Sequence, residues 1–447
     1  MPRLLATGSN GHGQLGIAHR DDVSRFTPCL FSDGRNPLED STVRVLSLVS
    51  GGNHSLLLLT SARGRNEIWV TGSNRHGELG PGIGPSVNVW TPLDLAAVRG
   101  AAGLVEEGTI YEPVAIGCTW SSTFIAFSRS LISDSGLRIS DVIVSFGSND
   151  FGELGCGEIT RDSSAIAGKA NIVRIPGWDA HDSRSRMRVQ QIATGQRHIV
   201  CLCVISTDGH EEQTVYGWGA ARHGQLSTST HSETSNDTSH AGPSREPIRR
   251  AAKYPTTHTT PTQLDIRASL ALASSISHIA CGASHTVLCT SAGALITLGS
   301  NAKRQRDVPM SCTAVACTWN GTVGWDEKGA WAVGSNTHGQ LGRRQLSSVS
   351  ATENDYISFD DLATPVHIQS IVCGSEHTLL LTQQGTLYAW GWNEHGNLGV
   401  GSLEDQWTPR RVSVSGEDGG VPRVRGVWAG CGTSWVLVDD RVWAESP

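Results

Sequence analysis

The chain has 447 residues, a formal charge of −7 and an isoelectric point near 6.2. It therefore lacks the excess of basic residues with which nucleic-acid-binding proteins displace counterions, and direct duplex binding is not expected. Hydrophobic residues make up 38% and charged residues 17%, a balance that suits a large buried core and excludes a disordered chain.

The N-terminus enters a glycine-rich turn after five or six residues, which leaves no room for a signal peptide. No apolar run approaches the length of a membrane-spanning helix. The 11 cysteines include no C-x-x-C pair, and several precede a glycine in an apolar run, as in Cys281-Gly282. We interpret them as small buried hydrophobes in a reducing compartment, and we expect a cytoplasmic and also a nuclear location.

A glycine-rich phrase, GSNGHGQLG in its first copy, recurs seven times, each time after an apolar strand. The copies begin at Gly8, Gly72, Gly147, Gly219, Gly299, Gly334 and Gly391. The phrase superficially resembles a phosphate-binding loop, but no helical pattern follows it, and seven copies indicate seven equal structural roles. We predict that these glycines supply turn positions of positive φ and that the leucine before the last glycine fills the core.

A second phrase, which precedes an apolar strand, alternates with the first and also occurs seven times. In four copies it contains a histidine, at His54, His198, His285 and His377. One histidine per repeat is too dispersed for a single metal site. We expect each to hydrogen-bond backbone within its own repeat. In two copies, GCTWSS and ACTWNG, Trp120 and Trp319 take the place of the histidine.

Each repeat is a set of three or four short strands that cannot bury both faces alone, so neighbouring repeats must stack. We predict one all-β domain over residues 1–447, a seven-bladed β-propeller in which the N- and C-terminal strands complete one blade. Two loop insertions interrupt it. Residues 227–263, rich in Ser, Thr, His and Pro, are predicted to be disordered, and residues 343–364 form a shorter loop.

Tryptophan is the commonest hot-spot residue of protein interfaces, which makes the variant repeats candidates for a partner-binding surface. Packing between blades is the alternative interpretation. The candidate residues are Trp120, Trp319 and a group near the ring closure that comprises Trp392, Glu394, His395 and Trp435. A second set of histidines lies within the glycine-rich turns and is interpreted as a surface feature: His12, His76, His223, His338 and His395.

No spacing typical of a catalytic triad, an H-E-x-x-H site or a carboxylate pair is legible in the sequence. The sequence therefore predicts a non-enzymatic protein with no catalytic residues, no metal site and no cofactor in this chain.

The alternating phrases resemble the repeat of the regulator-of-chromosome-condensation family over nearly the whole chain. Within the family the chain is most similar to a fungal subgroup, the small alpha-tubulin suppressor proteins. That similarity rests on the passages LLATGSNGHGQLG, GCTWSS, ACTWNG, GSEHTLLLTQQGTLYAWGWNEHGNLG and PRVRGVWAGCGTSWVLV.

The resemblance implies a propeller that forms a heterodimer with a small zinc- or iron-binding protein of the diphthamide pathway, with the metal on the partner. The pair would support diphthamide synthesis on elongation factor 2 and Elongator-dependent modification of the tRNA wobble uridine. The chief alternative is a guanine-nucleotide exchange factor for a small GTPase, which the negative charge and the lack of a basic N-terminal tail disfavour. A substrate-recognition or photoreceptor propeller ranks last, because no appended domain or dense Trp-Arg cluster is present.

Overall fold

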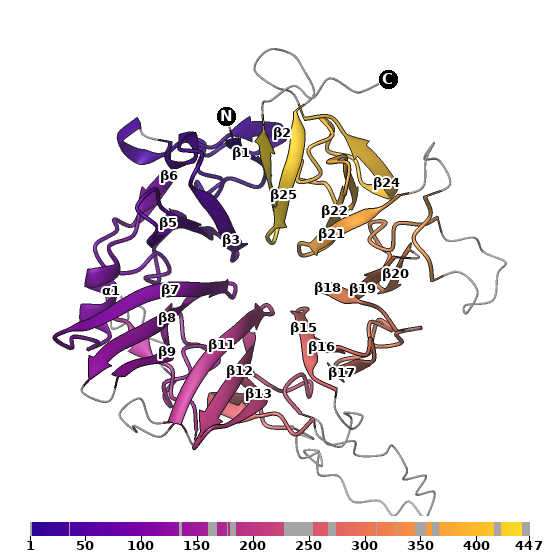
Figure 1. Ribbon diagram of the computed structural model, residues 1–447. Helices are drawn as coiled ribbons and strands as arrows, with labels where there is room; N and C mark the ends of the chain where they lie inside the picture. The colour runs from indigo at the N-terminus through magenta and orange to yellow at the C-terminus, as the bar shows by residue number, and fades with distance from the viewer. Residues whose placement is uncertain are drawn as a thin grey trace, which may run out of the picture.

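In the computed structural model seven small antiparallel sheets surround a central opening (Figure 1). The structure describes residues 2–34, 36–133, 136–159, 168–176, 178, 185–227, 254–266, 274–309, 311–327, 329–344, 355–359, 366–414 and 422–439. The seven-bladed β-propeller expected from the repeats is confirmed.

The first three blades have four strands each, ordered from the channel outward along the chain. Blade 1 contains β3 (Arg44–Ser50), β4 (His54–Thr60), β5 (Asn66–Ser73) and β6 (Ser86–Pro92). Blade 2 contains β7 (Thr109–Cys118), β8 (Ser122–Ser133), β9 (Gly136–Gly147) and the short β10 (Asn171–Ile172). Blade 3 contains β11 (Ser185–Thr194), β12 (His198–Thr207), β13 (His210–Ala220) and β14 (Thr257–Gln263).

Blades 4 and 5 have three strands each among the described residues, whereas blade 6 has four. Blade 4 contains β15 (Ile276–Cys281), β16 (His285–Thr290) and β17 (Leu295–Gly299). Blade 5 contains β18 (Ala314–Thr318), β19 (Gly321–Asp326) and β20 (Gly329–Gly334). Blade 6 contains β21 (Ile368–Cys373), β22 (His377–Thr382), β23 (Leu387–Gly391) and β24 (Gln406–Val412).

Blade 7 joins the two ends of the chain. It contains β25 (Arg423–Ala429) and β26 (Thr433–Asp439) from the C-terminal end and β1 (Pro2–Gly8) and β2 (Val23–Pro28) from the N-terminal end. The central pair of this sheet is antiparallel from Pro2 opposite Asp439 to Gly8 opposite Thr433. The ring is therefore closed by hydrogen bonds between the chain ends, as the sequence predicted.

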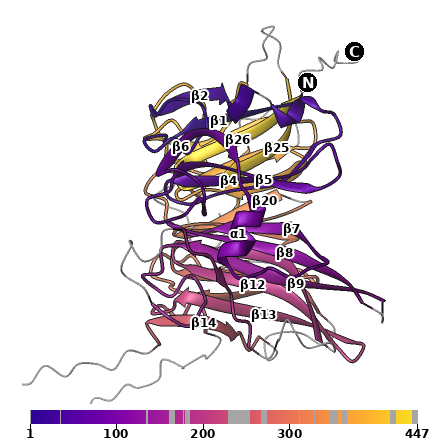
Figure 2. The same cartoon turned by 90° about the vertical axis from the view of Figure 1, so that its left-hand side faces the viewer.

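The hydrophobic core is divided among the interfaces between blades, which stack face to face around the ring (Figure 2). The described residues form seven buried clusters, each of which takes side chains from two adjacent blades. The cluster between blades 1 and 2 also takes Val98 from the single α-helix of the described residues, α1 (Leu95–Ala101), which Asp94 caps. No described helix is long and apolar enough to cross a membrane.

The expected loop insertions are described only in part. Residues 228–253 lie outside the described residues, but residues 257–263 form β14 and pair with β13. The prediction of disorder over 227–263 is therefore wrong at its C-terminal end, because Thr-rich sequence can complete a sheet edge when a neighbouring strand offers its backbone. In the segment 343–364, Tyr356 forms an isolated bridge with Trp331, and residues 345–354 and 360–364 lie outside the described residues.

Candidate functional site

One face of the propeller carries both repeated phrases. The second phrase forms the turn between the first and second strands of a blade, and the glycine-rich phrase follows the third strand. Because the strands are antiparallel, both turns lie at the same end of the sheet. In every blade the N–H of the residue after the first glycine of the glycine-rich phrase donates to a carbonyl in the other turn, for example from Ser73 to Asn53 at 2.8 Å and from Trp392 to Glu376 at 2.9 Å. We call this end of the ring the turn face.

The first glycine of each copy holds this connection together. All seven glycines have φ between 93° and 123°, a region that L side chains rarely adopt. At Gly72 an added Cβ would also lie 2.3 Å from the carbonyl oxygen of Asn53. Five of the leucines that follow are buried, namely Leu15, Leu79, Leu154, Leu226 and Leu398, whereas Leu341 is partly buried. These glycines and leucines build the turn face, as the sequence predicted.

The four repeated histidines connect adjacent blades, which differs from the expected bonds within one blade. Nε2 of His54 lies 3.0 Å from Oγ1 of Thr123 in the next blade, and that hydroxyl donates to the carbonyl of Glu78 back in blade 1. Equivalent contacts join His198, His285 and His377 to Thr286, Thr322 and Ser434. Each imidazole packs against a glycine three residues earlier, where a Cβ would come within about 2.4 Å of it.

Burial keeps these histidines neutral. It lowers the pKa of His54 and His198 to about 3 and that of His285 and His377 to about 4. A neutral imidazole whose Nε2 donates to the hydroxyl leaves Nδ1 as an acceptor, and in all four rings Nδ1 is buried without a hydrogen-bond partner. In all four cases the ring links adjacent blades through a buried hydroxyl group.

The strand register places the two variant tryptophans at a different position from the one expected. His54 pairs with Gly72, and the residues that pair with the corresponding glycines in blades 2 and 5 are Ser122 and Gly321. Trp120 and Trp319 therefore do not replace the histidine. They stand two residues earlier, at the tip of the innermost turn, where the other blades have Gly52, Gln196, Ala283, Ser375 and Cys431.

The two tryptophans reach from blades on opposite sides of the ring and meet over the channel. Their ring centroids are 5.8 Å apart at an interplanar angle of 47°. The backbone of each is fixed by both neighbours: Trp120 donates to Gln196 at 3.0 Å and accepts from Gly52 at 2.8 Å. The absence of a side chain at Gly52 makes room for the Trp120 indole, since a Cβ there would lie 2.8 Å from it. Both tryptophans are half-buried.

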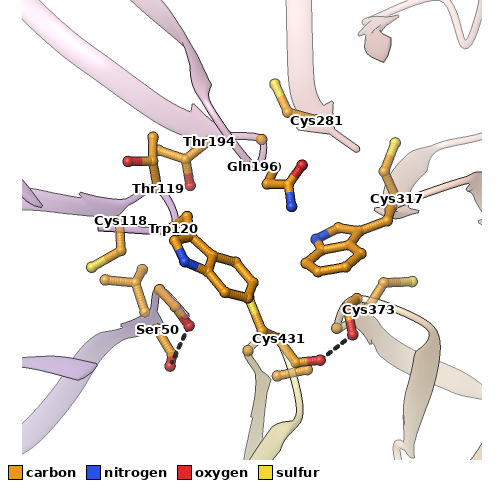
Figure 3. A pocket seen from close by; sticks show the side chains of 18 of the residues that line it. Ser50, Cys118, Thr119, Trp120, Thr194, Gln196, Cys281, Cys317, Cys373 and Cys431 are labelled. Atoms are coloured by element: carbon orange, nitrogen blue, oxygen red, sulfur yellow. Dashed lines mark hydrogen bonds between the residues drawn. The ribbon is translucent and has the colours of Figure 1, made fainter. Parts of the chain in front are cut away.

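Beneath this pair lies a cavity of about 160 Å³ whose wall carries five cysteines, Cys118, Cys281, Cys317, Cys373 and Cys431. Figure 3 shows their side chains around the opening, with Trp120 and Gln196 among them. Burial raises the pKa of Cys281, Cys373 and Cys431 to about 12. These thiols therefore stay protonated and form a weakly polar wall. The sequence predicted small buried hydrophobes; Cys118 is buried, but the other four are partly exposed at the channel, and their gathering there was not predicted. Four of the five stand just before the innermost turn, and this shared position was the available signal.

The remaining candidates divide between surface and core. Trp392 and His395 stack edge to face on the turn face, with centroids 5.1 Å apart, and Glu394 beside them is exposed. Trp435 is fully buried in the cluster between blades 7 and 1. It cannot contact a partner, so its assignment to the binding surface is wrong and the packing alternative applies.

The histidines of the glycine-rich turns lie on the turn face as well. Two of them bridge adjacent blades: Nδ1 of His338 is 2.8 Å from Oδ2 of Asp405, and Nδ1 of His395 is 2.7 Å from Oδ2 of Asp22. His12 and His76 instead line a polar pocket of about 240 Å³ beside Trp120.

These features define a class of protein: a closed seven-bladed propeller whose repeated turns, linked by backbone hydrogen bonds, lie on one face of the ring. Residues 3–438 match the family model of the RCC1-like domain, and the chain belongs to this family.

Two relatives resemble the chain over nearly its full length. A secretion-regulating guanine nucleotide exchange factor of Bos taurus is 26% identical over 97% of this chain and 82% of its own length. An RCC1 repeat-containing protein of Schizosaccharomyces pombe is 24% identical over 98% of this chain and 99% of its own. Among solved structures, human WBSCR16 superposes with a TM-score of 0.69 at 18% identity, covering 99% of this chain and 100% of that one, which supports the fold.

Proposed function

We propose that the protein is a non-catalytic adaptor that binds a protein partner through its turn face. The observation that carries this proposal is the contact between Trp120 and Trp319 at the mouth of the channel. Half-buried indoles surrounded by polar turns reproduce the anatomy of a protein interface, in which an aromatic centre is desolvated inside a polar rim.

The partner we propose is a small zinc- or iron-binding protein of the diphthamide pathway. The feature that supports it is the resemblance of the tryptophan-bearing turns, GCTWSS and ACTWNG, to the alpha-tubulin suppressor subgroup. The pair would act in diphthamide synthesis on elongation factor 2 and in Elongator-dependent tRNA modification, with the metal and the chemistry supplied by the partners. The acidic net charge of this chain plays no part in the proposal.

The proposal is tested by mixing the purified chain with the small metalloprotein of the same organism. Size-exclusion chromatography with light scattering should show a stable one-to-one complex. Two species that elute separately, at concentrations well above 10 μM, would refute the proposed partner.

The second candidate is a guanine-nucleotide exchange factor, because a relative that matches 97% of the chain carries that name. An exchange factor must speed nucleotide release from a GTPase. Release of a fluorescent guanine nucleotide from small GTPases of the same organism, measured with and without the chain, separates the two functions. Acceleration by the chain would favour exchange activity, and an unchanged rate would favour the adaptor.

A further inference from the structure

The turn face is built from seven similar units, so its backbone alone would let a partner dock in seven nearly equivalent rotations. The residues next to the tryptophans break this symmetry. In the innermost turns, the position directly after the tip is occupied by Asn53, Ser121, Arg197, Ser284, Asn320, Glu376 and Gly432 in blades 1 to 7. Only two of the seven are charged, and their charges are opposite.

Each of the two charged residues lies next to one of the two tryptophans, at the same position relative to it. The backbone N–H of Trp120 donates to the carbonyl of Gln196 in the next blade at 3.0 Å, and Arg197 is the residue after Gln196. In the same way, the N–H of Trp319 donates to the carbonyl of Ser375 in the next blade at 2.7 Å, and Glu376 is the residue after Ser375. Arg197 therefore flanks Trp120, and Glu376 flanks Trp319. The apolar centre of the face thus lies between a cation on one side of the channel and an anion on the other.

Both charged side chains are held in place before any partner arrives. The guanidinium carbon of Arg197 lies 4.3 Å from the centroid of the Phe151 ring. The carboxylate of Glu376 accepts hydrogen bonds from Nδ2 of Asn320 at 3.0 Å and from Nε2 of Gln340. Both residues are half-buried. Preorganised, partly desolvated charges lose little side-chain entropy on binding and discriminate strongly against a like charge.

A second arginine, Arg75, shares a pocket with Arg197. The polar pocket beside Trp120 is lined by Arg197, Arg75, His12 and His76, together with the carboxyl groups of Glu78 and Asp150. Both carboxyl groups already have partners within the chain: Glu78 accepts a hydrogen bond from the backbone N–H of His76 at 2.7 Å, and Asp150 accepts one from Ser148 at 3.0 Å. The two arginines therefore leave this side of the face able to receive a carboxylate.

We propose that the turn face binds its protein partner in one orientation, with an apolar group of the partner against Trp120 and Trp319, a carboxylate against Arg197, and an ammonium or guanidinium group against Glu376. This inference rests on the proposed function, because it takes the turn face as the docking surface. It adds the charge layout of the partner and the reason why one rotation out of seven is selected.

The decisive variant is the double exchange Arg197→Glu with Glu376→Lys, which reverses the layout and leaves the net charge unchanged. Binding of the small diphthamide-pathway metalloprotein is measured by titration calorimetry at low salt. Each single exchange and the double exchange should raise Kd by about tenfold or more, because each sets like charges against each other. The matched controls are Arg63→Glu and Glu211→Lys, on hairpins at the opposite end of the blades, and they should stay within about twofold of the unaltered chain.

Two further results decide the proposal. If the unaltered chain binds the metalloprotein and the double exchange binds it equally well, the charge layout is irrelevant and the inference is overturned while the proposed function stands. If the unaltered chain fails to bind, the proposed function is overturned and the inference with it.

Glu376 also stabilises its surroundings, so Glu376→Gln provides a milder variant that keeps the shape of the side chain. The melting temperature of this variant should be unchanged. Its binding should be weaker by about threefold, which is the effect of removing one partly exposed ion pair. Its affinity should also depend less on salt concentration. A native melting temperature together with unchanged affinity and salt dependence would overturn the role of Glu376.

Discussion

Trp120 and Trp319 reach the channel mouth because each stands at the tip of a turn that two hydrogen bonds tie to the neighbouring turns. Changing either to Ala should weaken partner binding by about 2 kcal/mol, which is the size of an interface hot spot. The melting temperature should change little, because both side chains are only half-buried. Calorimetric titration of each variant with the metalloprotein measures the effect, and wild-type affinity in both would assign the pair to packing alone.

For Trp435 we expect the reverse: a change in stability and none in partner binding. It is fully buried between blades 7 and 1, so Trp435→Ala should destabilise the fold by about 3–5 kcal/mol. Affinity, measured at a temperature where the variant is folded, should stay near that of the unaltered chain. Chemical denaturation gives the stability change, and a stable variant that has lost binding would contradict the division between surface and core.

The four buried histidines make stability depend on pH. Their folded pKa of about 3 to 4 lies below the ordinary value of 6.5, so the unfolded chain binds more protons below pH 6.5. Stability therefore falls as the pH decreases from about 6.5 towards 4. Buried carboxyl groups with a raised pKa, such as Glu153 at about 7, act in the opposite direction, and a comparison of variants is needed to separate the two.

The comparison uses His54→Asn, which keeps a side-chain donor and removes one titrating group. Melting temperatures between pH 7.5 and 4.5 should fall less steeply for this variant than for the unaltered chain. If the two slopes are the same, His54 does not resist protonation in the folded state.

The positions of Trp120 and Trp319 within their turns could not be predicted from the sequence, because they depend on the strand register. The sequence showed that Trp120 and Trp319 break the repeat, but it aligned them with the histidines because a Ser follows Trp120 as it follows His54, and an apolar strand comes next. Only the pairing of Ser122 with Gly147 and of Gly321 with Gly334 shows the two-residue offset. The partners of the histidines were missed for a related reason: they lie in the next blade, 37 to 88 residues away in sequence.

Among the elements, blades 4 and 5 depart most from the repeat. The degenerate turn after Gly299 has Arg306 where the other copies have their core leucine, and Nη1 of Arg306 donates to the carbonyl of Gly299 at 2.8 Å. No fourth strand follows in the described part of blade 4. The sequence showed the degenerate turn but not its consequence, because three-stranded and four-stranded blades share the same first three strands.

The interface between blades 4 and 5 should be the least stable part of the ring. Among the described residues its buried cluster comprises Val287, Cys289, Cys312, Val315, Trp331 and Val333, whereas the cluster between blades 1 and 2 has more than twice as many buried members. Less buried apolar area gives less resistance to local opening. Native-state hydrogen exchange should be faster in β16 and β19 than in β4 and β8, and equal protection would contradict this ranking.

For the whole molecule, the ring is closed by the pairing of β26 with β1 and β25. The fold class and the joining of the chain ends were predictable, since seven repeats and their split final unit are local sequence features. Removing residues 433–447 deletes β26, which pairs with both β25 and β1. Thermal unfolding of this truncated chain should lose its cooperative transition, and a truncation after Asp439 that keeps β26 is the control. A cooperative transition at the original temperature would refute closure by these strands.

The central claim is that the turn face, centred on Trp120 and Trp319, is the docking surface. The most direct test is amide hydrogen exchange of the chain with and without the metalloprotein at saturating concentration. The account predicts new protection at residues 119–121, 195–197, 318–320 and 374–376, and none at the opposite hairpins, residues 61–65, 208–209 and 383–386. Protection confined to those hairpins, or no protection anywhere, would contradict it.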